Sequence, residues 1–141
     1  MELLVACKNK NHSEIERLLA DADLDVNFVD ENTWTPLKSA CLHNDIEAVR
    51  LLLSRSDIDI NKKDEVGRTP IVLSIEPTSN KQGETVHKDE IFEMLMARPE
   101  LNLTRQVNNC VSLLEYMEMI SSKKEMRDAV LARLKETDIK I

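Results

Sequence analysis

Aromatic residues are scarce in this chain of 141 residues, which has one Trp, one Tyr and two Phe. A core must therefore be built from aliphatic side chains, which suits thin helical layers better than a β-sandwich. Apolar residues still make up 42% of the chain, which is enough for a core and argues against wholesale disorder. The length corresponds to one small domain.

Glycine and cysteine are also rare, at two and three residues. Gly67 and Gly83 are too few for a glycine-rich phosphate loop. An odd number of cysteines argues against a disulfide framework, so we expect a reducing compartment, the cytoplasm or the nucleus. Cys7 and Cys41 each follow an alanine, and we expect them to be small buried hydrophobes. A chemical role would require a base or a metal partner, and the sequence shows neither.

Long apolar runs and excess positive charge are absent as well. No apolar run approaches the ~20 residues that span a bilayer, and residues 1–5 lack the features of a secretory signal. The formal net charge of −7 would repel a phosphate backbone, so we expect no nucleic-acid partner, and the lack of a spanning run predicts no membrane partner. His12, His43 and His87 have no metal-ligand spacing, and the acid-rich segments 21–25 and 57–59 lack the pattern of a calcium loop. No cofactor, metal or catalytic group is expected.

What the sequence does contain is a repeat with a period of 34 residues, seen first in Thr35-Pro36 and Thr69-Pro70. In each pair the threonine can cap a helix whose first residue is the proline. A period of this size indicates stacked repeats. The same shift matches Leu37 with Leu3, Ala40 with Ala6, Cys41 with Cys7, Val49 with Ile15, Leu52 and Leu53 with Leu18 and Leu19, and Asp59-Ile60-Asn61 with Asp25-Val26-Asn27.

The repeating unit of helix, turn, helix and extended arm resembles the ankyrin repeat, whose signature includes Thr-Pro-Leu-His-x-Ala. This chain has Thr-Pro-Leu-Lys-Ser-Ala at 35–40. Lys38 and Val72 replace the usual His, and Asn44 and Lys10 replace the glycine of the helix–helix turn. Because lysine tolerates left-handed backbone less well than asparagine, we expect the first turn to differ in shape.

The resemblance implies an all-α repeat solenoid of four stacked helix-turn-helix units with projecting arms, the first and last units acting as caps. We expect one domain, 1–141, with units at about 1–29, 30–63, 64–106 and 107–141. The expected inner helices are 2–10, 36–42, 70–75 and one starting at Ser112. The expected outer helices are one capped by Ser13 with Glu16, 46–54 capped by Asp45, 89–97, and 123–135 capped by Ser122 with Glu125, whose Arg133 faces water.

The third unit is nine residues longer than the others, and the excess lies in 76–88. Pro, Gly, Ser, Asn and Thr dominate this segment, which predicts a surface loop between the two helices of the unit. Such an insertion is tolerated whether or not it has a task, because loop entropy grows slowly with length. It is either a solvated insertion or a binding element.

Repeat proteins bind partners on their concave surface, and the resemblance implies contacts from the arm tips and from the exposed side of the inner helices. Lys8 and Asn9 hold the helix-side positions of the first unit. The contact candidates of the later units are Glu31, Asn32, Trp34, Ser39, Leu42, His43, Glu65, Val66, Arg68, Asn108, Asn109 and Val111.

Trp34 is the most distinctive candidate, because it is the only Trp and stands in register with Arg68 and Val111. An exposed Trp beside an Arg is a plausible interface anchor. The alternative is that Trp34 folds over the arm and covers its own repeat. If Trp34 is an anchor, Trp34→Ala abolishes partner binding while the thermal midpoint hardly moves.

These patterns predict a non-catalytic protein–protein interaction module, an adaptor or an occluding inhibitor. Its acidic charge favours a partner with a basic patch, and its polar last helix favours a monomer. The alternative is a regulatory or inhibitory subunit acting on an enzyme or a nucleic-acid-binding factor, as in a viral or bacterial host-interaction protein.

Asn27 and Asn61 match asparagines that are hydroxylated in some ankyrin repeats, but we expect them to bond the backbone of their turns.

Overall fold

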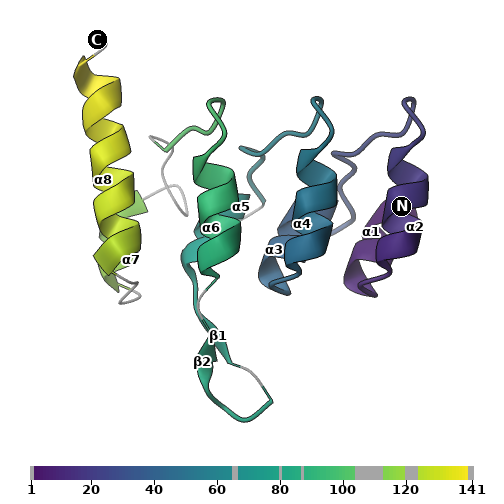
Figure 1. Cartoon of the computed structure of the whole chain (residues 1–141), viewed down its shortest axis with the longest axis horizontal. Helices are drawn as coiled ribbons and strands as arrows, with labels where there is room; N and C mark the ends of the chain where they lie inside the picture. Colours follow the sequence, from purple (N-terminus) through teal and green to yellow (C-terminus); the bar gives the residue numbers. More distant parts are fainter. Residues whose placement is uncertain are drawn as a thin grey trace.

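The computed structural model describes residues 2–64, 67–79, 81–86, 88–103, 113–119 and 124–139. Within them the helices form pairs that stand in a row (Figure 1). The inner row consists of α1 (Glu2–Lys8), α3 (Pro36–Leu42), α5 (Pro70–Ile75) and α7 (Leu113–Met119), and the outer row of α2 (His12–Leu19), α4 (Ile46–Leu53), α6 (Asp89–Met96) and α8 (Lys124–Ile139). From the first pair to the third, each helix packs on its partner and on the next helix of its row.

The core lies between the two rows and is almost entirely aliphatic. Residues one period apart are buried to the same depth: Leu3 and Leu37 are each 1% exposed, and Ile15 and Val49 are each 0% exposed. Burial alone raises the pKa of the Cys41 thiol to about 12, against a smaller opposing effect of Lys88. Cys7 also has a thiol pKa raised to about 12, by burial and then by Asp45. At neutral pH both thiols are therefore protonated, and they pack as small apolar groups.

The helices begin with the predicted N-caps and first-position prolines, except at Thr69 and at Ser13. Thr35 Oγ1 accepts a hydrogen bond from the Lys38 amide at 3.2 Å, and Asp45 caps α4 through the Ala48 amide at 3.3 Å. Thr69 has the same extended backbone as Thr35, but its side chain accepts no capping hydrogen bond. Its helix start therefore relies on Pro70, whose fixed φ angle suits the first helical position.

The predicted capping box at Ser13 is wrong. Helix α2 begins one residue earlier, at His12, and Asn11 is its N-cap. The Asn11 side chain accepts from the Glu14 amide at 3.3 Å. Asn11 stands one period before Asp45, so the repeat places the cap correctly where the local Ser-x-x-Glu pattern does not.

The α1–α2 turn and the α3–α4 turn have the same shape, although we expected the first to differ. Lys10 and Asn44 both adopt left-handed backbone, with φ of 55° and 53°. The amide of each donates to a cysteine carbonyl one turn back, Cys7 or Cys41, at 3.2 Å in both cases. The strain of a left-handed lysine is ~1 kcal/mol, and the turn's hydrogen bonds offset it. This turn also ends α1 at Lys8, two residues earlier than predicted.

Apolar and polar residues alternate along the arms, but the described backbone of the arms follows turns and not the extended conformation that was expected. Val26, Ile58 and Ile60 are all below 7% exposure, whereas Leu24 and Phe28 are half-buried. The intervening aspartates shape the turns, because Asp25 and Asp59 each accept from the amide two residues ahead at 2.9 Å. The carboxylates of the acid-rich segments therefore organise backbone, and no metal is needed to explain them.

Asn27 and Asn61 bond the backbone of the following arm instead of their own turn. The Asn27 amide group donates to the Asp57 carbonyl at 2.9 Å, and its oxygen accepts from the Asp59 amide at 2.7 Å. Asn61 repeats this pattern one unit later with Glu100 and Asn102, at 2.7 and 2.8 Å. These two side chains form a polar ladder along the arms and fix the spacing of the units.

Three arginines connect later segments of the chain to the ends of α2, α4 and α6. Arg55 donates to the Leu19 carbonyl at the end of α2 at 3.1 Å, and Arg98 to the Leu53 carbonyl at the end of α4 at 2.7 Å. Arg133 does the same from α8 toward the end of α6, bonding the carbonyls of Met96 and Arg98. The prediction that Arg133 faces water is therefore wrong. These guanidinium groups satisfy carbonyls that a helix end leaves without partners.

The insertion forms a hairpin and not an irregular loop. Strands β1 (Thr78–Ser79) and β2 (Thr85–Val86) pair antiparallel, with Thr78 opposite Val86. The hairpin projects from the side of the row that carries the helix–helix turns (Figure 1). It ends at Lys88, which occupies the N-cap position of α6 but is 1% exposed and makes no capping bond. The Lys88 ammonium group instead donates to the Leu73 carbonyl at 2.9 Å.

The last helix pair is attached to the rest by buried methionines and by Tyr116. Met117 and Met126 are 0% and 4% exposed, and the Tyr116 hydroxyl donates to Glu76 at 2.5 Å. Helix α8 extends to Ile139, four residues beyond the predicted end. The predicted caps Ser112 and Ser122, together with His87 and Cys110, lie outside the described residues.

Candidate functional site

The inner face is the surface formed by α1, α3, α5 and the described arm tips 28–34, 62–64 and 67–68. Helices α3 and α5 present little of it, because every residue from Pro36 to Cys41 and from Pro70 to Ile75 is buried. Ser39, predicted as a contact residue, is only 2% exposed, so that surface assignment is wrong. Of α1, α3 and α5, only α1 and the end of α3 contribute accessible side chains to this face.

A charged cluster at the first and second arm tips explains part of this burial. Lys38 Nζ lies 2.9 Å from Asp64 Oδ2, and the two side chains are 0% and 3% exposed. Arg68 pairs with the same carboxylate at 3.0 Å, and its amide donates to Asp64 Oδ1 at 2.9 Å. Trp34 packs against both cations, with its ring centre 4.6 Å from Lys38 Nζ and 5.5 Å from Arg68 Cζ. These four residues are called the tip cluster below.

Burial and pairing act in opposite directions on the pKa values in the tip cluster. Burial lowers the pKa of Lys38, and the hydrogen bond to Asp64 only partly restores it. For Asp64, burial acts to raise the pKa, but the bonds from Lys38 and from the Arg68 amide outweigh it and leave the pKa below its ordinary value. The ion pair is thus intact at neutral pH and holds two repeats together in a largely water-free position.

Trp34 lies beside Arg68 as expected, but it is partly buried rather than freely exposed. It covers the junction between its own repeat and the next one, which is neither of the two predicted arrangements. A cation over an indole face gains ~1 kcal/mol or more when partly desolvated. Trp34 therefore has a structural role whatever else it contacts.

A groove lies at the first arm, where α1 meets the tip. It has a volume of ≈ 340 Å³ and is lined by Leu4, Val5, Lys8, Phe28, Val29, Asp30, Glu31 and Asn32. Val5 is 50% exposed and Val29 is 37% exposed, which is unusual for large apolar side chains. Lys8 Nζ lies 3.4 Å from Asp30 Oδ2 at the edge, and Lys8 keeps half of its side chain exposed. This first-arm groove combines an apolar floor with a charged rim.

A family model for ankyrin repeats, described as "Ankyrin repeats (3 copies)", matches residues 3–106. The chain belongs to the ankyrin repeat family. Ankyrin repeats are in general protein–protein interaction modules and are typically not catalytic. No curated protein matches the chain significantly in sequence. Helices α7 and α8 lie beyond the matched residues.

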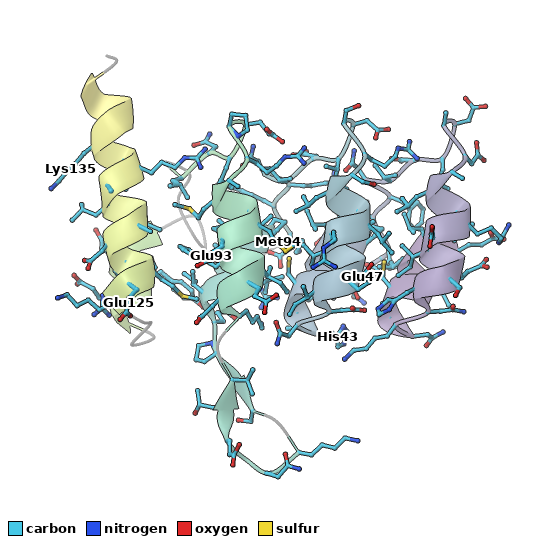
Figure 2. The ribbon with its side chains drawn as sticks, in the orientation of Figure 1. His43, Glu47, Glu93, Met94, Glu125 and Lys135 are labelled. Atoms are coloured by element: carbon cyan, nitrogen blue, oxygen red, sulfur yellow. The ribbon has the colours of Figure 1, made fainter. Side chains whose placement is uncertain are left out.

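Apart from the buried Ser39, the predicted contact residues of this ankyrin repeat protein fall into four groups. Glu31 and Asn32 are exposed and line the first-arm groove. His43 is exposed at the end of α3, on the turn side of the row (Figure 2), and Leu42 beside it is half-buried. Arg68 belongs to the tip cluster. Glu65, Val66, Asn108, Asn109 and Val111 lie outside the described residues.

Val5, Phe28 and Val29 are the groove residues that the sequence reasoning missed. A signal was present in both segments. Residues 3–7 of α1 are apolar without interruption, and five consecutive positions cover every direction around a helix, so one of them must face outward. Phe28 and Val29 are adjacent apolar residues in an arm that otherwise alternates, so one of them must leave the buried side.

Neither metal chemistry nor a membrane span finds support in the described part of the chain. Its His, Cys, Asp and Glu side chains form no group of three or more that could hold a metal ion. Its helices are too short or too polar to cross a bilayer.

Proposed function

We propose that this ankyrin repeat protein binds a partner protein through its inner face, with the first-arm groove as the main contact and without catalysis. The observation that carries the proposal is the pair of exposed valines, Val5 and Val29, at the groove. Exposed apolar side chains gathered at one place mark interaction sites, whereas single ones do not. Bound in this way, the chain acts as an adaptor or as an inhibitor that occludes its partner's surface.

Electrostatics supports a partner with a basic patch. The net charge of −7 steers such a partner toward the chain, and the groove itself carries Asp30 and Glu31 on its rim. Trp34, Leu42, His43 and Arg68 extend the proposed contact surface along the inner face. We propose that they contact the partner, and we propose the same for Glu65, Val66, Asn108, Asn109 and Val111.

The proposal also covers the unit boundaries, the oligomeric state and the cellular compartment. We take the units as 1–29, 30–63, 64–106 and 107–141, with α1–α2 and α7–α8 as caps that close the stack. A monomer in the cytoplasm or the nucleus is the state we propose. The mainly charged exposed side of α8 supports the monomer, and the buried, protonated thiols of Cys7 and Cys41 are compatible with either compartment.

The proposal is tested with Val5→Glu and Val29→Glu, using Leu131→Glu as the matched control. Leu131 is 40% exposed, between the values of the two valines, but lies on α8 outside the inner face. The three variants thus carry the same change in charge at similar exposure. Proteins captured from lysate by the tagged chain are expected to be lost with both valine variants and retained with Leu131→Glu. Capture that survives both valine substitutions would contradict the groove as the main contact.

The alternative function is that of a regulatory or inhibitory subunit, and the projecting hairpin gives it a distinct surface. In that case partners would survive the valine substitutions but disappear when residues 78–86 are replaced by a short turn. The comparison of these two sets of variants assigns binding either to the inner face or to the insertion.

A further inference from the structure

A second groove lies on the outer side of the molecule, between α6 and α8. Its volume is ≈ 570 Å³, within the range of about 300–1,000 Å³ that ligand sites occupy. The lining residues of this outer groove come from α6 and α8, which belong to the outer row (Figure 1), whereas the inner face is formed by α1, α3, α5 and the arm tips. It is therefore separate from the surface of the proposed function and is argued independently of it.

The outer groove has an apolar floor. Phe92 and Met126 are each 4% exposed, and Met96 and Ala129 are half-buried beside them. Ala97 and Ala129 are small, so the walls leave room above this floor. Unbranched methionines adapt their shape to an incoming side chain, which suits an apolar anchor from a partner.

The rim of the outer groove is acidic. All three charged side chains that line it are carboxylates: Asp89 and Glu93 from α6 and Glu125 from α8. Glu93 lies on the side of α6 nearer α8, while Met94 lies on the side nearer α4 (Figure 2). Within the described residues neither Glu93 nor Glu125 forms an ion pair. The nearby Arg133 is occupied by the carbonyls at the end of α6.

This acidity distinguishes α6 from the outer helices before it. Helices α2 and α4 each balance an acid with a base one turn on, through the pairs Glu14–Arg17 and Glu47–Arg50. Helix α6 contains Asp89, Glu90 and Glu93 and no basic residue. Glu93, on this wall of the outer groove, therefore has no basic residue of its own helix to pair with.

We propose that the outer groove binds a basic amphipathic helix, with an apolar anchor on the Phe92–Met126 floor and Lys or Arg side chains paired with Glu93 and Glu125. A groove between two helices accepts a third helix, whose anchors recur every third or fourth residue. The two acidic walls lie on opposite sides of the floor, which matches a helix that carries basic residues on both flanks of its apolar stripe. Charge complementarity of this kind gives both specificity and faster association.

The probe for this proposal is a short synthetic peptide of leucine and lysine patterned as an amphipathic helix. Its controls are a scrambled peptide of the same composition and a peptide with glutamate in place of lysine. Fluorescence anisotropy measures affinity, and methyl NMR of labelled methionine locates the site. The methyl signals of Met96 and Met126 are expected to shift, while that of Met94 stays in place and serves as an internal reference.

Two kinds of variant distinguish peptide binding in the outer groove from non-specific electrostatic attraction of the peptide to an acidic protein. Glu93→Lys with Glu125→Lys reverses the rim, and Ala97→Trp fills the groove sterically without changing charge. The charge-matched control is Glu16→Lys with Glu118→Lys, which reverses two exposed acids on α2 and α7. All substituted side chains are exposed, so circular dichroism and thermal midpoint are expected to stay unchanged.

The expected result is a loss of about tenfold or more in affinity for the rim variant and for Ala97→Trp, against about twofold for the charge-matched control. Val5→Glu, which alters the inner face, leaves peptide binding unchanged. The proposal is overturned by an equal loss in the charge-matched control, by equal binding of the scrambled peptide, by unmoved Met96 and Met126 signals, or by no binding of the helical peptide at all.

Discussion

At the scale of single residues, this protein shows how one repeat position acquires different roles from its neighbours. Asp30 and Asp64 stand one period apart, and both accept hydrogen bonds from amides of their own arm tips. Asp30 then pairs with Lys8, whose side chain is half exposed, whereas Asp64 pairs with the fully buried Lys38. The same side chain therefore makes a surface contact in one unit and a core contact in the next.

We expect Asp64→Asn to lower the free energy of unfolding by ~3 kcal/mol at neutral pH, because it leaves the Lys38 charge buried without its partner. The matched variant, Asp30→Asn, should cost ~1 kcal/mol or less, since its cation is solvated. Asparagine still accepts the amide bonds of the tip in both variants. Urea denaturation followed by circular dichroism measures both values, and equal costs would contradict the difference in burial.

The pKa of Asp64 adds a pH dependence with a defined sign. Because the folded state lowers this pKa below the ordinary value of 3.8, its stabilisation is present above about pH 4 and is lost as the pH falls through and below that value. The stability gap between the parent chain and Asp64→Asn is therefore expected to narrow in urea titrations at about pH 3.

At the scale of elements, helix ends were the best predicted features where proline or the repeat itself fixed them. Pro36 and Pro70 begin α3 and α5 as expected, because a proline at the first helical position costs no hydrogen bond. The local pattern at Ser13 was misleading, since Asn11 at the repeat-equivalent position already caps α2. Periodicity was thus a stronger guide than any single cap motif.

Contacts between units could not be predicted, because they join residues more than 20 positions apart in sequence. Arg55 and Arg98 look like ordinary surface arginines in the sequence, yet they bond carbonyls of the preceding unit. The burial of Lys38 depends on Asp64 and Trp34 meeting it in space. The first-arm groove was missed for the same reason, since its walls come from α1 and from the first arm.

We expect Arg98→Ala to destabilise the protein by ~2 kcal/mol, because the carbonyl at the end of α4 loses a charge-assisted hydrogen bond. The control is Arg50→Ala, which removes an exposed pair with Glu47 on α4 and should cost ~0.5 kcal/mol or less. Thermal unfolding of the two variants checks this ranking. A cost for Arg98→Ala no greater than that of Arg50→Ala would show that the carbonyl is satisfied equally well by water.

At the scale of the whole molecule, stability is a property of neighbouring layers. Each unit is too thin to bury its own apolar residues, and one continuous aliphatic core runs from Leu3 to Val130. Stacked repeats of this kind gain most of their stability from the interfaces between units. An end unit therefore matters even when it contacts no partner.

We expect a chain that ends at residue 103 to lose ~3–5 kcal/mol of its unfolding free energy, a large fraction for a domain of this size. The cause is the loss of Met117, Met126 and Val130 from the core, together with the Arg133 contacts to the end of α6. Urea denaturation of the two chains measures the difference. Equal midpoints would mean that α7 and α8 are an appendage and not a cap.

The three arginines also give the stack a direction. Arg55, Arg98 and Arg133 all reach from a later segment back to an earlier one. During synthesis α2, α4 and α6 thus leave the ribosome with their final carbonyls open, and each gains its arginine only after the next arginine-bearing segment has emerged. These arginine contacts therefore form in order from the amino terminus. A stalled ribosome would hold a nascent chain whose most recently emerged outer helix still lacks the arginine that bonds its final carbonyls.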